Sequence, residues 1–483
     1  MFSVLLNEAI DINRDKKYDM TDISVRKRAI TMWEKWKKII LLAIPSLASF
    51  ASVTLTGTIS LIMVGKLGTV PIAVVGVTNI IMYNAWALFS GIGHTVNYLV
   101  AQNYGANEIE QGVKRTYIAL YMSIVAALLV LLLGLFGSSS IFRWMGSSQE
   151  MITAGNDYLQ LRFFAMAFSI LIFVFHGFLR GIGDTKTPMV SSLVGGGIMV
   201  FLTYSLTYGN FGFSEYGLKG AGVAFLLAEL ATLLICAYVY FIKLNPRFRT
   251  RRVVSYDRSE TKLIFFESSK LGLQEFSMAM AMFVFTIFVT QLGTTALAAN
   301  EVALNVMSFG FMPAFAFGTT ATILVGHQIG QGNAKLGKNY GTHTAIIGSI
   351  FLLLVGTLEL FLAEPIARMY TDDKEVYELA ALLIKTSAYL QLFDGFLNFF
   401  AGGLRGIGDT TFLLKISLLL GWLLFIPLSY LFIFTMGLGS MGAWLALYTY
   451  LVCFGLSVMI RFYKTDWGSL RKLKTYEKAE VPG

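Results

Sequence analysis

The sequence predicts an all-α integral membrane protein with about twelve transmembrane helices in two six-helix lobes. Three observations predict this fold: an apolar composition, apolar blocks of membrane-spanning length, and an internal repeat. Hydrophobic residues make up 55% of the 483 positions and charged residues 14%, and the mean hydropathy is +0.65. A soluble domain carries about 25% charged residues, so this composition indicates that lipid surrounds much of the chain.

Long apolar blocks recur along the whole chain. Blocks such as 39–64 and 342–362 are close to the ~20 residues that cross a ~30 Å hydrocarbon core. They lack the alternation of barrel strands, and a helix satisfies its own backbone groups in lipid, so each block predicts a helix. The predicted spans are 39–64, 71–101, 116–137, 155–180, 188–209, 219–243, 265–290, 296–325, 342–363, 375–404, 411–435 and 439–462.

Basic residues gather in three places: before the first span, between the sixth and seventh spans, and after the last span. Loops an even number of spans apart lie on the same side, so the positive-inside rule places these clusters and both termini in the cytoplasm. The net charge of +9 is divided among the clusters and not gathered on one folded module, so nucleic acid is not an expected partner. The predicted parts are a cytoplasmic N-terminal segment (1–37), an N-lobe (38–243), a cytoplasmic basic linker (244–262), a C-lobe (263–462) and a cytoplasmic tail (463–483).

Short motifs repeat at a fixed spacing. Leu179–Thr185 reads LRGIGDT, and Leu404–Thr410 repeats it 225 residues later. The same shift aligns Leu67–Thr69 with Leu292–Thr294. Because each half holds six spans, both halves enter and leave the membrane on the same side. The repeat therefore predicts two lobes related by a pseudo-twofold axis along the membrane normal.

The two RGIGDT motifs follow the fourth span of each half and predict structural hinge loops. An arginine at a helix C-terminus suits the helix dipole and the lipid headgroups, glycines permit a tight reversal, and an aspartate can cap the next helix. A phosphate-binding role is the alternative, although the chain has no GxxxxGK[ST] sequence typical of an ATPase. The hinge residues are Arg180, Gly181, Gly183 and Asp184 in the first loop and Arg405, Gly406, Gly408 and Asp409 in the second.

Further motifs occur around these loops. They are Val100–Asn107 (VAQNYGAN), Ala298–Asn305 (AANEVALN), Gly326–Asn333 (GHQIGQGN) and Gly437–Trp444 (GLGSMGAW). Together with the doubled LRGIGDT, they resemble the multidrug and toxic compound extrusion (MATE) family of transporters over residues 38–461. The resemblance implies a twelve-helix, two-lobed exporter of organic cations, driven by proton or sodium influx, in a bacterial inner membrane.

Ionisable residues at membrane depth are candidates for the coupling-ion and substrate site, because a charge in lipid is unfavourable without a partner or a function. Asp394 lies toward the middle of the tenth span, eleven residues before Arg405, where the resemblance places a C-lobe carboxylate for H⁺ or Na⁺. Gln391 lies one turn before it. Glu275 lies about ten residues into the seventh span, where the family often carries a glutamate, and Gln274 could share ligation with it. A structural hydrogen bond between helices is the alternative for each.

Two further acids are candidates in the apolar spans. Glu229 lies eight to ten residues into the sixth span and has no counterpart in the family, so function and a buried pairing both stay open. Glu301 lies nearer the outer boundary, where a long side chain can reach the headgroups. Many MATE proteins carry acids late in the first span and in the fifth, but 58–64 and 199–204 contain no carboxylate. The coupling site is therefore expected in the C-lobe.

The residues and the resemblance together predict a secondary-active antiporter that exports amphipathic organic cations in exchange for H⁺ or Na⁺ by alternating access. We expect no cofactor, no enzymatic activity, no metal other than a coupling Na⁺, and a monomer in the lipid bilayer. The first alternative is a flippase for a lipid-linked sugar, which requires that Arg162 or Lys385 supply a basic cavity. A channel and a membrane-embedded enzyme are weaker alternatives, because the sequence shows neither polar rings nor an HExxH or triad-like arrangement.

Overall fold

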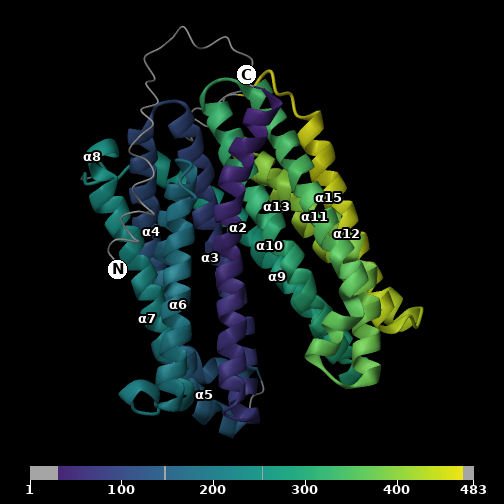
Figure 1. Ribbon diagram of the computed structural model, residues 1–483. Helices are drawn as coiled ribbons and strands as arrows, with labels where there is room; N and C mark the ends of the chain where they lie inside the picture. The colour runs from purple at the N-terminus through teal and green to yellow at the C-terminus, as the bar shows by residue number, and fades with distance from the viewer. Residues whose placement is uncertain (1–30, 146–147, 253, 471–483) are drawn as a thin grey trace.

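The computed structural model describes residues 31–145, 148–252 and 254–470, and the regular structure in these ranges is helical. Long helical segments cross the molecule from one end to the other (Figure 1). In the first half they are α2 (Met32–Gly65), α3 (Thr69–Gly105), α4 (Ile109–Trp144), α5 (Gln149–Gly181), α6 (Lys186–Tyr208) and α7 (Gly217–Tyr238), which continues as η3 (Val239–Lys243). In the second half they are α9 (Arg258–Thr290), α10 (Thr294–Gly330), α11 (Ala334–Tyr370), α12 (Lys374–Ile407), α13 (Thr410–Leu420) and α15 (Gly439–Lys464).

Shorter helices complete the chain. The helix α13 continues through η4 (Gly421–Phe425), α14 (Ile426–Tyr430) and η5 (Leu431–Thr435), so that Thr410–Thr435 forms one membrane-length segment. The π-helical turns η4 and η5 flank Pro427, whose missing N–H disturbs the regular α-helical hydrogen bonds. The small helices η2 (Asn210–Gly212) and α8 (Asn245–Phe248) lie in connections.

The long segments have the length and composition of membrane spans. Within the described residues, eleven helices are long and apolar enough to cross a bilayer. The remaining long helix, α12, has 34 residues but carries several charged side chains, which lower its hydropathy. Every predicted span falls on one of these twelve segments, most of which are a few residues longer than predicted. The predicted all-α membrane fold is confirmed.

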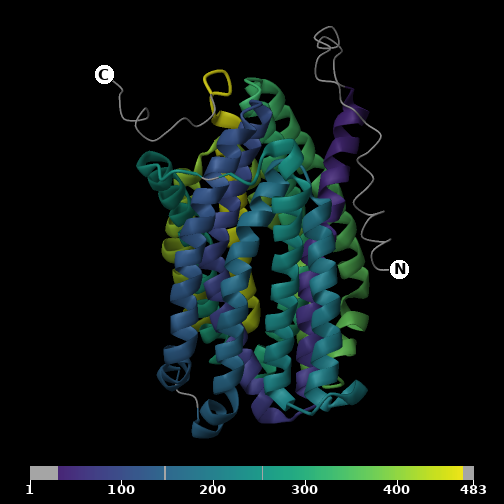
Figure 2. The same ribbon diagram turned by 90° about the vertical axis from the view of Figure 1, so that its left-hand side faces the viewer.

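The helices form two lobes of six spans, as the repeat predicted. The N-lobe contains α2 to α7 and lies in front in Figure 2, and the C-lobe contains α9 to α15. In the N-lobe α5 packs against α3 and α7, and in the C-lobe its counterpart α12 packs against α10 and α15. Between the lobes, α3 packs on α9 and α10 packs on α2, with α3 and α10 also in contact. These equivalent interfaces have the pattern of a twofold axis that runs along the bundle.

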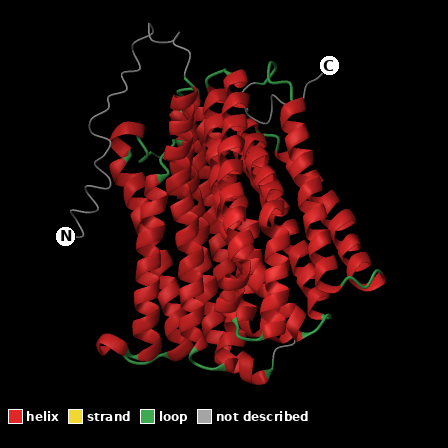
Figure 3. Cartoon of the chain, turned by 45° about the vertical axis from the view of Figure 1, so that its right-hand side comes forward, coloured by secondary structure: helices red, strands yellow, loops and turns green. Residues whose placement is uncertain are grey.

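The two ends of the bundle differ. The RGIGDT loops, the segment between the lobes and both ends of the described chain lie at one end, at the top of Figure 1, which we name the linker end. Loops are confined to the two ends of the molecule (Figure 3). Hydrogen bonds between the lobes lie near the linker end in the described residues, as in the pairs Lys35–Asn339 and Gln102–Gly406. The lobes diverge towards the opposite end (Figure 1), so the molecule is closed at the linker end.

The range 244–262, predicted as a linker, contains α8, an extended stretch and the first turn of α9. Helix α9 begins early because Asp257 caps it: the carboxylate accepts hydrogen bonds from the backbone N–H of Ser259 and Glu260 at 3.0 and 3.2 Å. The predicted N-terminal segment and C-terminal tail lie largely outside the described residues.

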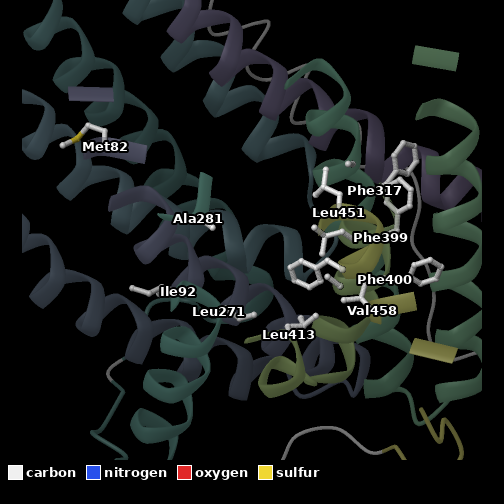
Figure 4. Close-up of a cluster of buried hydrophobic side chains, with 14 of the residues drawn as sticks. Met82, Ile92, Leu271, Ala281, Phe317, Phe399, Phe400, Leu413, Leu451 and Val458 are labelled. Carbon is white, nitrogen blue, oxygen red and sulfur yellow. The ribbon is translucent and has the colours of Figure 1, made fainter. Parts of the chain in front are cut away.

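Small residues let the helices of the C-lobe pack closely. Phe317 of α10, Phe399 of α12 and Leu451 of α15 belong to the buried cluster shown in Figure 4. Gly348 of α11 leaves room for the Phe399 ring, since a Cβ at this glycine would lie 2.5 Å from the ring. Helices in lipid associate through such close packing, because lipid is as apolar as their side chains. This packing fixes the position of α12, which carries most of the candidate site.

Candidate functional site

One face of α12 carries buried polar side chains. Gln391, Asp394 and Asn398 follow one another at helical spacings of three and four residues, and Asp394 is 5% exposed. The side-chain amide of Asn398 donates to the Asp394 carboxylate at 3.3 Å and to the Asp394 carbonyl at 2.9 Å. Among the described residues, Asp394 forms no salt bridge with a basic side chain. It is therefore a buried carboxyl group held by a neutral amide.

An ion pair between Glu275 of α9 and Arg405 of α12 lies near this face. Arg405 Nη2 donates to Glu275 Oε1 at 3.0 Å, and the two side chains are 9% and 8% exposed. The prediction that Arg405 reaches the lipid headgroups is wrong. The side chain is buried in the C-lobe, because α9 supplies a carboxylate that neutralises its charge there. The pair ties α9 to the end of α12.

A small cavity lies beside the ion pair. Its polar lining comes from Gln274, Glu275, Asn398 and Arg405, and Phe315 contributes to its apolar wall. The cavity measures about 10 Å³, which is room for about one water molecule or one small cation. The side-chain oxygen of Gln274 is buried and has no hydrogen-bond partner in the described part of the chain. The size and lining suit an ion and exclude an organic molecule.

The N-lobe carries a different pair at the equivalent position. Under the 225-residue shift, Arg180 corresponds to Arg405 and Phe50 corresponds to Glu275. The guanidinium of Arg180 lies 4.8 Å from the centre of the Phe50 ring, which is a cation–π contact. The repeated arginine therefore meets an aromatic face in one lobe and a carboxylate in the other.

Glu359 of α11 is a buried acid that the sequence interpretation did not single out. The amide nitrogen of Gln391 donates to Glu359 Oε2 at 2.5 Å. Gly310 of α10 makes room for this amide, since a Cβ at Gly310 would lie 1.7 Å from the Gln391 oxygen. The signal that could have found Glu359 is an acid inside the apolar block 342–362.

Two of the predicted site residues lie apart from these groups. Glu229 of α7 is half-buried in the N-lobe and lies near Ser169 of α5, which corresponds to Asp394 under the repeat. Glu301 is exposed near the opposite end of α10. The structure thus gathers Gln274, Glu275 and Asn398 at one cavity, and it separates Glu229 and Glu301 from it.

The basic residues that a flippase would require do not line this cavity. Arg162 is half-buried in the N-lobe, with its guanidinium 3.8 Å from the centre of the Phe225 ring. Lys385 is exposed on α12. The cavity beside the Glu275–Arg405 pair is therefore not the basic cavity that the flippase alternative requires Arg162 or Lys385 to supply.

The aspartates of the two RGIGDT loops have different partners. Asp184 caps α6, because its carboxylate accepts from the backbone N–H of Lys186 and Thr187 at 3.1 and 3.0 Å. Asp409 makes no side-chain cap to α13, and its carboxylate instead accepts from Arg461 Nε of α15 at 2.7 Å. The first loop thus has the expected cap and the second has an ion pair.

The RGIGDT loops also take part in a contact between the lobes. Nε2 of Gln102, near the end of α3, donates to the Gly406 carbonyl of the C-lobe loop at 2.9 Å. Nε2 of His327, near the end of α10, donates to the Gly181 carbonyl of the N-lobe loop at 2.8 Å. Gln102 corresponds to His327 under the repeat, and Gly181 corresponds to Gly406. Each lobe therefore binds the RGIGDT loop of the other lobe through a residue at the same position of the repeat.

A buried ion pair joins α4 to α9 at the linker end. Arg115 Nε donates to Glu260 Oε2 at 2.8 Å, and both side chains are buried. Nearby, the Tyr98 hydroxyl of α3 and the Thr410 hydroxyl of α13 donate to Glu267 Oε2 of α9 at 2.8 and 2.6 Å. Breaking a buried ion pair leaves uncompensated charge, so opening this end requires new partners or water for these groups.

Each half of the chain matches the same protein family. The profile of the family named MatE matches residues 45–205 and, separately, residues 271–431. The chain belongs to the MatE family. Each match runs from the first to the fifth span of a lobe, so the internal repeat is a repeat of the MatE unit.

This MatE protein is similar over most of its length to proteins named "Probable multidrug resistance protein NorM". It is 25% identical to the one from Thermotoga maritima over 449 residues, which are 92% of this chain and 96% of the relative. It is 27% identical to the one from Mannheimia succiniciproducens over 468 residues, which are 92% of this chain and 98% of the relative. The similarity therefore extends through both lobes.

Solved structures share the fold. A multidrug resistance MATE transporter of the MOP superfamily in an outward-facing conformation has a TM-score of 0.82 at 22% identity, with 89% of this chain and 96% of that chain covered. The crystal structure of MATE in complex with MaD3S has a TM-score of 0.81, with the same identity and coverage. The two-lobed MATE fold is thus confirmed for this chain.

The MatE chain distributes its buried acids unequally between the lobes. Glu275, Glu359 and Asp394 are buried away from the helix ends, and all three belong to the C-lobe. In the described part of the N-lobe, the acid away from the helix ends is the half-buried Glu229. Negative charge that could hold a cation inside the membrane is therefore concentrated in the C-lobe.

Proposed function

We propose that this protein is a secondary-active multidrug efflux transporter that exports amphipathic organic cations in exchange for H⁺ or Na⁺. The MatE family and the NorM-named relatives support multidrug efflux. The observation that carries the exchange is Asp394, a carboxyl group buried at membrane depth and hydrogen-bonded by the neutral amide of Asn398. Such a group favours a bound proton or cation, because a bare carboxylate is poorly solvated away from water.

The closed linker end supports alternating access. The reciprocal bonds of Gln102 and His327 hold the lobes together there, while the lobes diverge at the opposite end (Figure 1). The basic clusters favour a cytoplasmic linker end, and the described state then faces outward. A coupling ion from outside reaches Asp394, neutralises it and weakens its attraction for a cationic substrate, which leaves outward. We place the protein as a monomer in a bacterial inner membrane, with both termini in the cytoplasm.

Aromatic side chains on the N-lobe support a cationic substrate. Tyr83 and Trp86 of α3 stack with ring centres 5.9 Å apart, and Tyr83 is 50% exposed. The Tyr83 hydroxyl lies within electrostatic range of Glu275 and Asp394 in the C-lobe. An exposed aromatic ring of the N-lobe therefore lies within electrostatic range of two acids of the C-lobe, and aromatic faces attract positive charge. This arrangement favours an amphipathic cation over an anionic lipid-linked sugar.

Uptake of a fluorescent organic cation into proteoliposomes tests the proposal. A proton gradient is imposed first and a sodium gradient second. We expect uptake under one gradient, and we expect Asp394→Asn to reduce it to the level of protein-free vesicles, because the amide binds neither ion as a carboxylate does. Glu301→Gln is the control, since it removes an exposed carboxylate from a membrane helix and should leave uptake unchanged.

Unchanged gradient-driven uptake in Asp394→Asn would exclude this residue as the coupling group. If the folded wild-type protein moves no organic cation under either gradient but translocates a lipid-linked sugar, the flippase alternative is correct instead.

A further inference from the structure

A groove on the outer surface at the linker end spans both lobes. Its volume is about 300 Å³. The side chains that shape it are Met122 of α4, Tyr256, and Arg258, Lys262, Phe265 and Phe266 of α9. Because α4 belongs to the N-lobe and α9 to the C-lobe, a molecule in this groove contacts both lobes at once.

The groove is basic near the start of α9 and apolar further along this helix. Arg258 and Lys262 lie one turn apart in the first turns of α9, on the same face of the helix. Phe265 lies seven residues beyond Arg258, about 10 Å further along the helix axis. Phe265 and Phe266 are both exposed, and Met122 lines the same groove. Positive charge followed by an apolar surface is complementary to a phosphate headgroup followed by an acyl chain.

Several acidic side chains around this end of α4 and α9 already have basic partners. The pairs are Arg115 with Glu260 (2.8 Å), Lys114 with Asp257 (2.6 Å) and Arg252 with Glu110 (3.3 Å). The hydrogen bond from the Lys114 ammonium lowers the pKa of Asp257 below its usual 3.8, so this carboxylate is ionised and paired at neutral pH. Arg258 and Lys262 are exposed and form no salt bridge within the ranges 31–145, 148–252 and 254–470. Two positively charged side chains at one end of the groove therefore have no acidic partner in the described residues.

We infer that an anionic phospholipid binds in this groove and stabilises the state that is closed at the linker end. Its phosphate binds Arg258 and Lys262, and an acyl chain packs against Met122, Phe265 and Phe266. The lipid binds best while α4 and α9 lie side by side, and a ligand shifts an equilibrium by its difference in affinity for the two states. The effect on the equilibrium rests on the proposed alternating access, whereas the binding itself does not.

Native mass spectrometry of the purified full chain tests the binding. The protein is equilibrated in detergent with phosphatidylglycerol and phosphatidylcholine, and bound lipids are counted. We expect the wild type to retain phosphatidylglycerol preferentially and Arg258→Gln/Lys262→Gln to lose that preference severalfold. The matched control is Arg247→Gln/Arg251→Gln, which removes the same charge from exposed arginines outside the groove and should retain the preference.

Three results would overturn the lipid site. They are an unchanged preference in Arg258→Gln/Lys262→Gln, an equal loss in the control pair, and displacement of phosphatidylglycerol by inorganic phosphate alone. The last result would assign the two cations to free phosphate, because the acyl contacts would then add nothing. All four substitutions change exposed side chains, so the melting temperatures should match the wild type.

Spin labels across the linker end test the effect on the lobes. Labels are attached at Lys186→Cys in the N-lobe and Lys335→Cys in the C-lobe, in a chain whose Cys236 and Cys453 are changed to Ser. In phosphatidylcholine nanodiscs, added phosphatidylglycerol should increase the closed population in the wild type and the control pair but not in the groove variant. Bound lipid with unchanged distances would overturn the closing role. A negative transport assay leaves the binding measurement intact, so the two failures are distinguishable.

Discussion

The arginine of the RGIGDT motif meets a different partner in each lobe. Arg405 pairs with the carboxylate of Glu275, whereas Arg180 lies over the ring of Phe50, which occupies the equivalent position. In the same way Asp394 of the C-lobe corresponds to Ser169 of the N-lobe. At these two positions the repeated backbone thus carries a carboxylate in the C-lobe and a neutral side chain in the N-lobe, and single substitutions can test this difference.

Substitutions at Glu275 and Arg405 should show strong coupling. Glu275→Leu alone leaves a buried guanidinium without its carboxylate, which should lower the free energy of unfolding by about 3 kcal/mol. Glu275→Leu/Arg405→Met removes both charges and should recover most of that loss. The measurement is the melting temperature of each purified variant in detergent.

Arg180→Met is the matched control, because the equivalent arginine lies over the Phe50 ring and forms no salt bridge in the described part of the chain. Its effect should be smaller than that of Glu275→Leu. If the two single substitutions at Glu275 and Arg405 add without coupling, the ion pair contributes nothing to stability.

At the scale of helices, glycines set how closely the lobes approach. A Cβ at Gly91 of α3 would lie 2.2 Å from the backbone nitrogen of Gly272 on α9. At the crossing of α3 with α10, a Cβ at Gly105 would lie 2.1 Å from the His327 carbonyl, and one at Gly330 would lie 2.0 Å from the Gln102 carbonyl. These distances are too short for a side chain, so the closed linker end depends on glycine at the helix crossings.

Gly91→Val should therefore favour the state that is open at the linker end. The added side chain forces α3 and α9 apart and should destabilise the closed state by about 1–3 kcal/mol. The labels at Lys186→Cys and Lys335→Cys report the change as a longer distance. Gly76→Val on the same helix is the control, since a Cβ at Gly76 meets nothing within 4 Å. Equal distances in the two variants would show that the glycine crossing does not hold the linker end closed.

At the scale of the whole molecule, the two lobes join through contacts that follow the repeat. Gln102 and His327 each bind the RGIGDT loop of the other lobe, and the contact of α3 with α9 has its equivalent in the contact of α10 with α2. The opposite end holds no hydrogen bond between the lobes in the described residues. Motion of the lobes as rigid bodies that breaks these contacts and brings the opposite ends together would exchange the closed end.

A cross-link between the lobes at the linker end should stop transport. Lys35 Nζ of α2 donates to Asn339 Oδ1 of α11 at 2.7 Å, so cysteines at these positions are within reach of a short cleavable bis-maleimide. We expect cation uptake to cease after cross-linking and to return after cleavage. Full uptake by the cross-linked protein would mean that the linker end need not open.

Lys338→Cys/Tyr463→Cys supplies the control for the reagent. These residues are also in contact at the linker end, where Lys338 Nζ donates to the Tyr463 carbonyl at 3.4 Å, but both belong to the C-lobe. A cross-link inside one lobe should leave uptake unchanged, because it does not restrain motion between the lobes.

Asp394 and Glu275 could be found in the sequence because an acid within an apolar span stands out. Glu359 carries the same signal and could have been found in the same way. Glu260 could not, since it lies near a helix start where a charged side chain is ordinarily exposed, yet it is buried against Arg115. Nothing in the sequence around Gln102 and His327 indicates that they join the lobes. Their equivalent hydrogen bonds to the opposite lobe are visible only in the tertiary structure.

The sequence by itself determined the number of spans, their positions along the chain and the twofold relation of the halves. Apolar length is a local property of the chain, and the doubled LRGIGDT is written directly in it. The tertiary structure decided the partners: Glu275 and Arg405 are 130 residues apart, and Gln102 and Gly406 are 304 apart. Such pairs depend on the rotation and crossing of helices, which hydropathy does not encode. The closed linker end, with its glycine crossings and the groove between α4 and α9, was therefore decided by the packing of the two lobes.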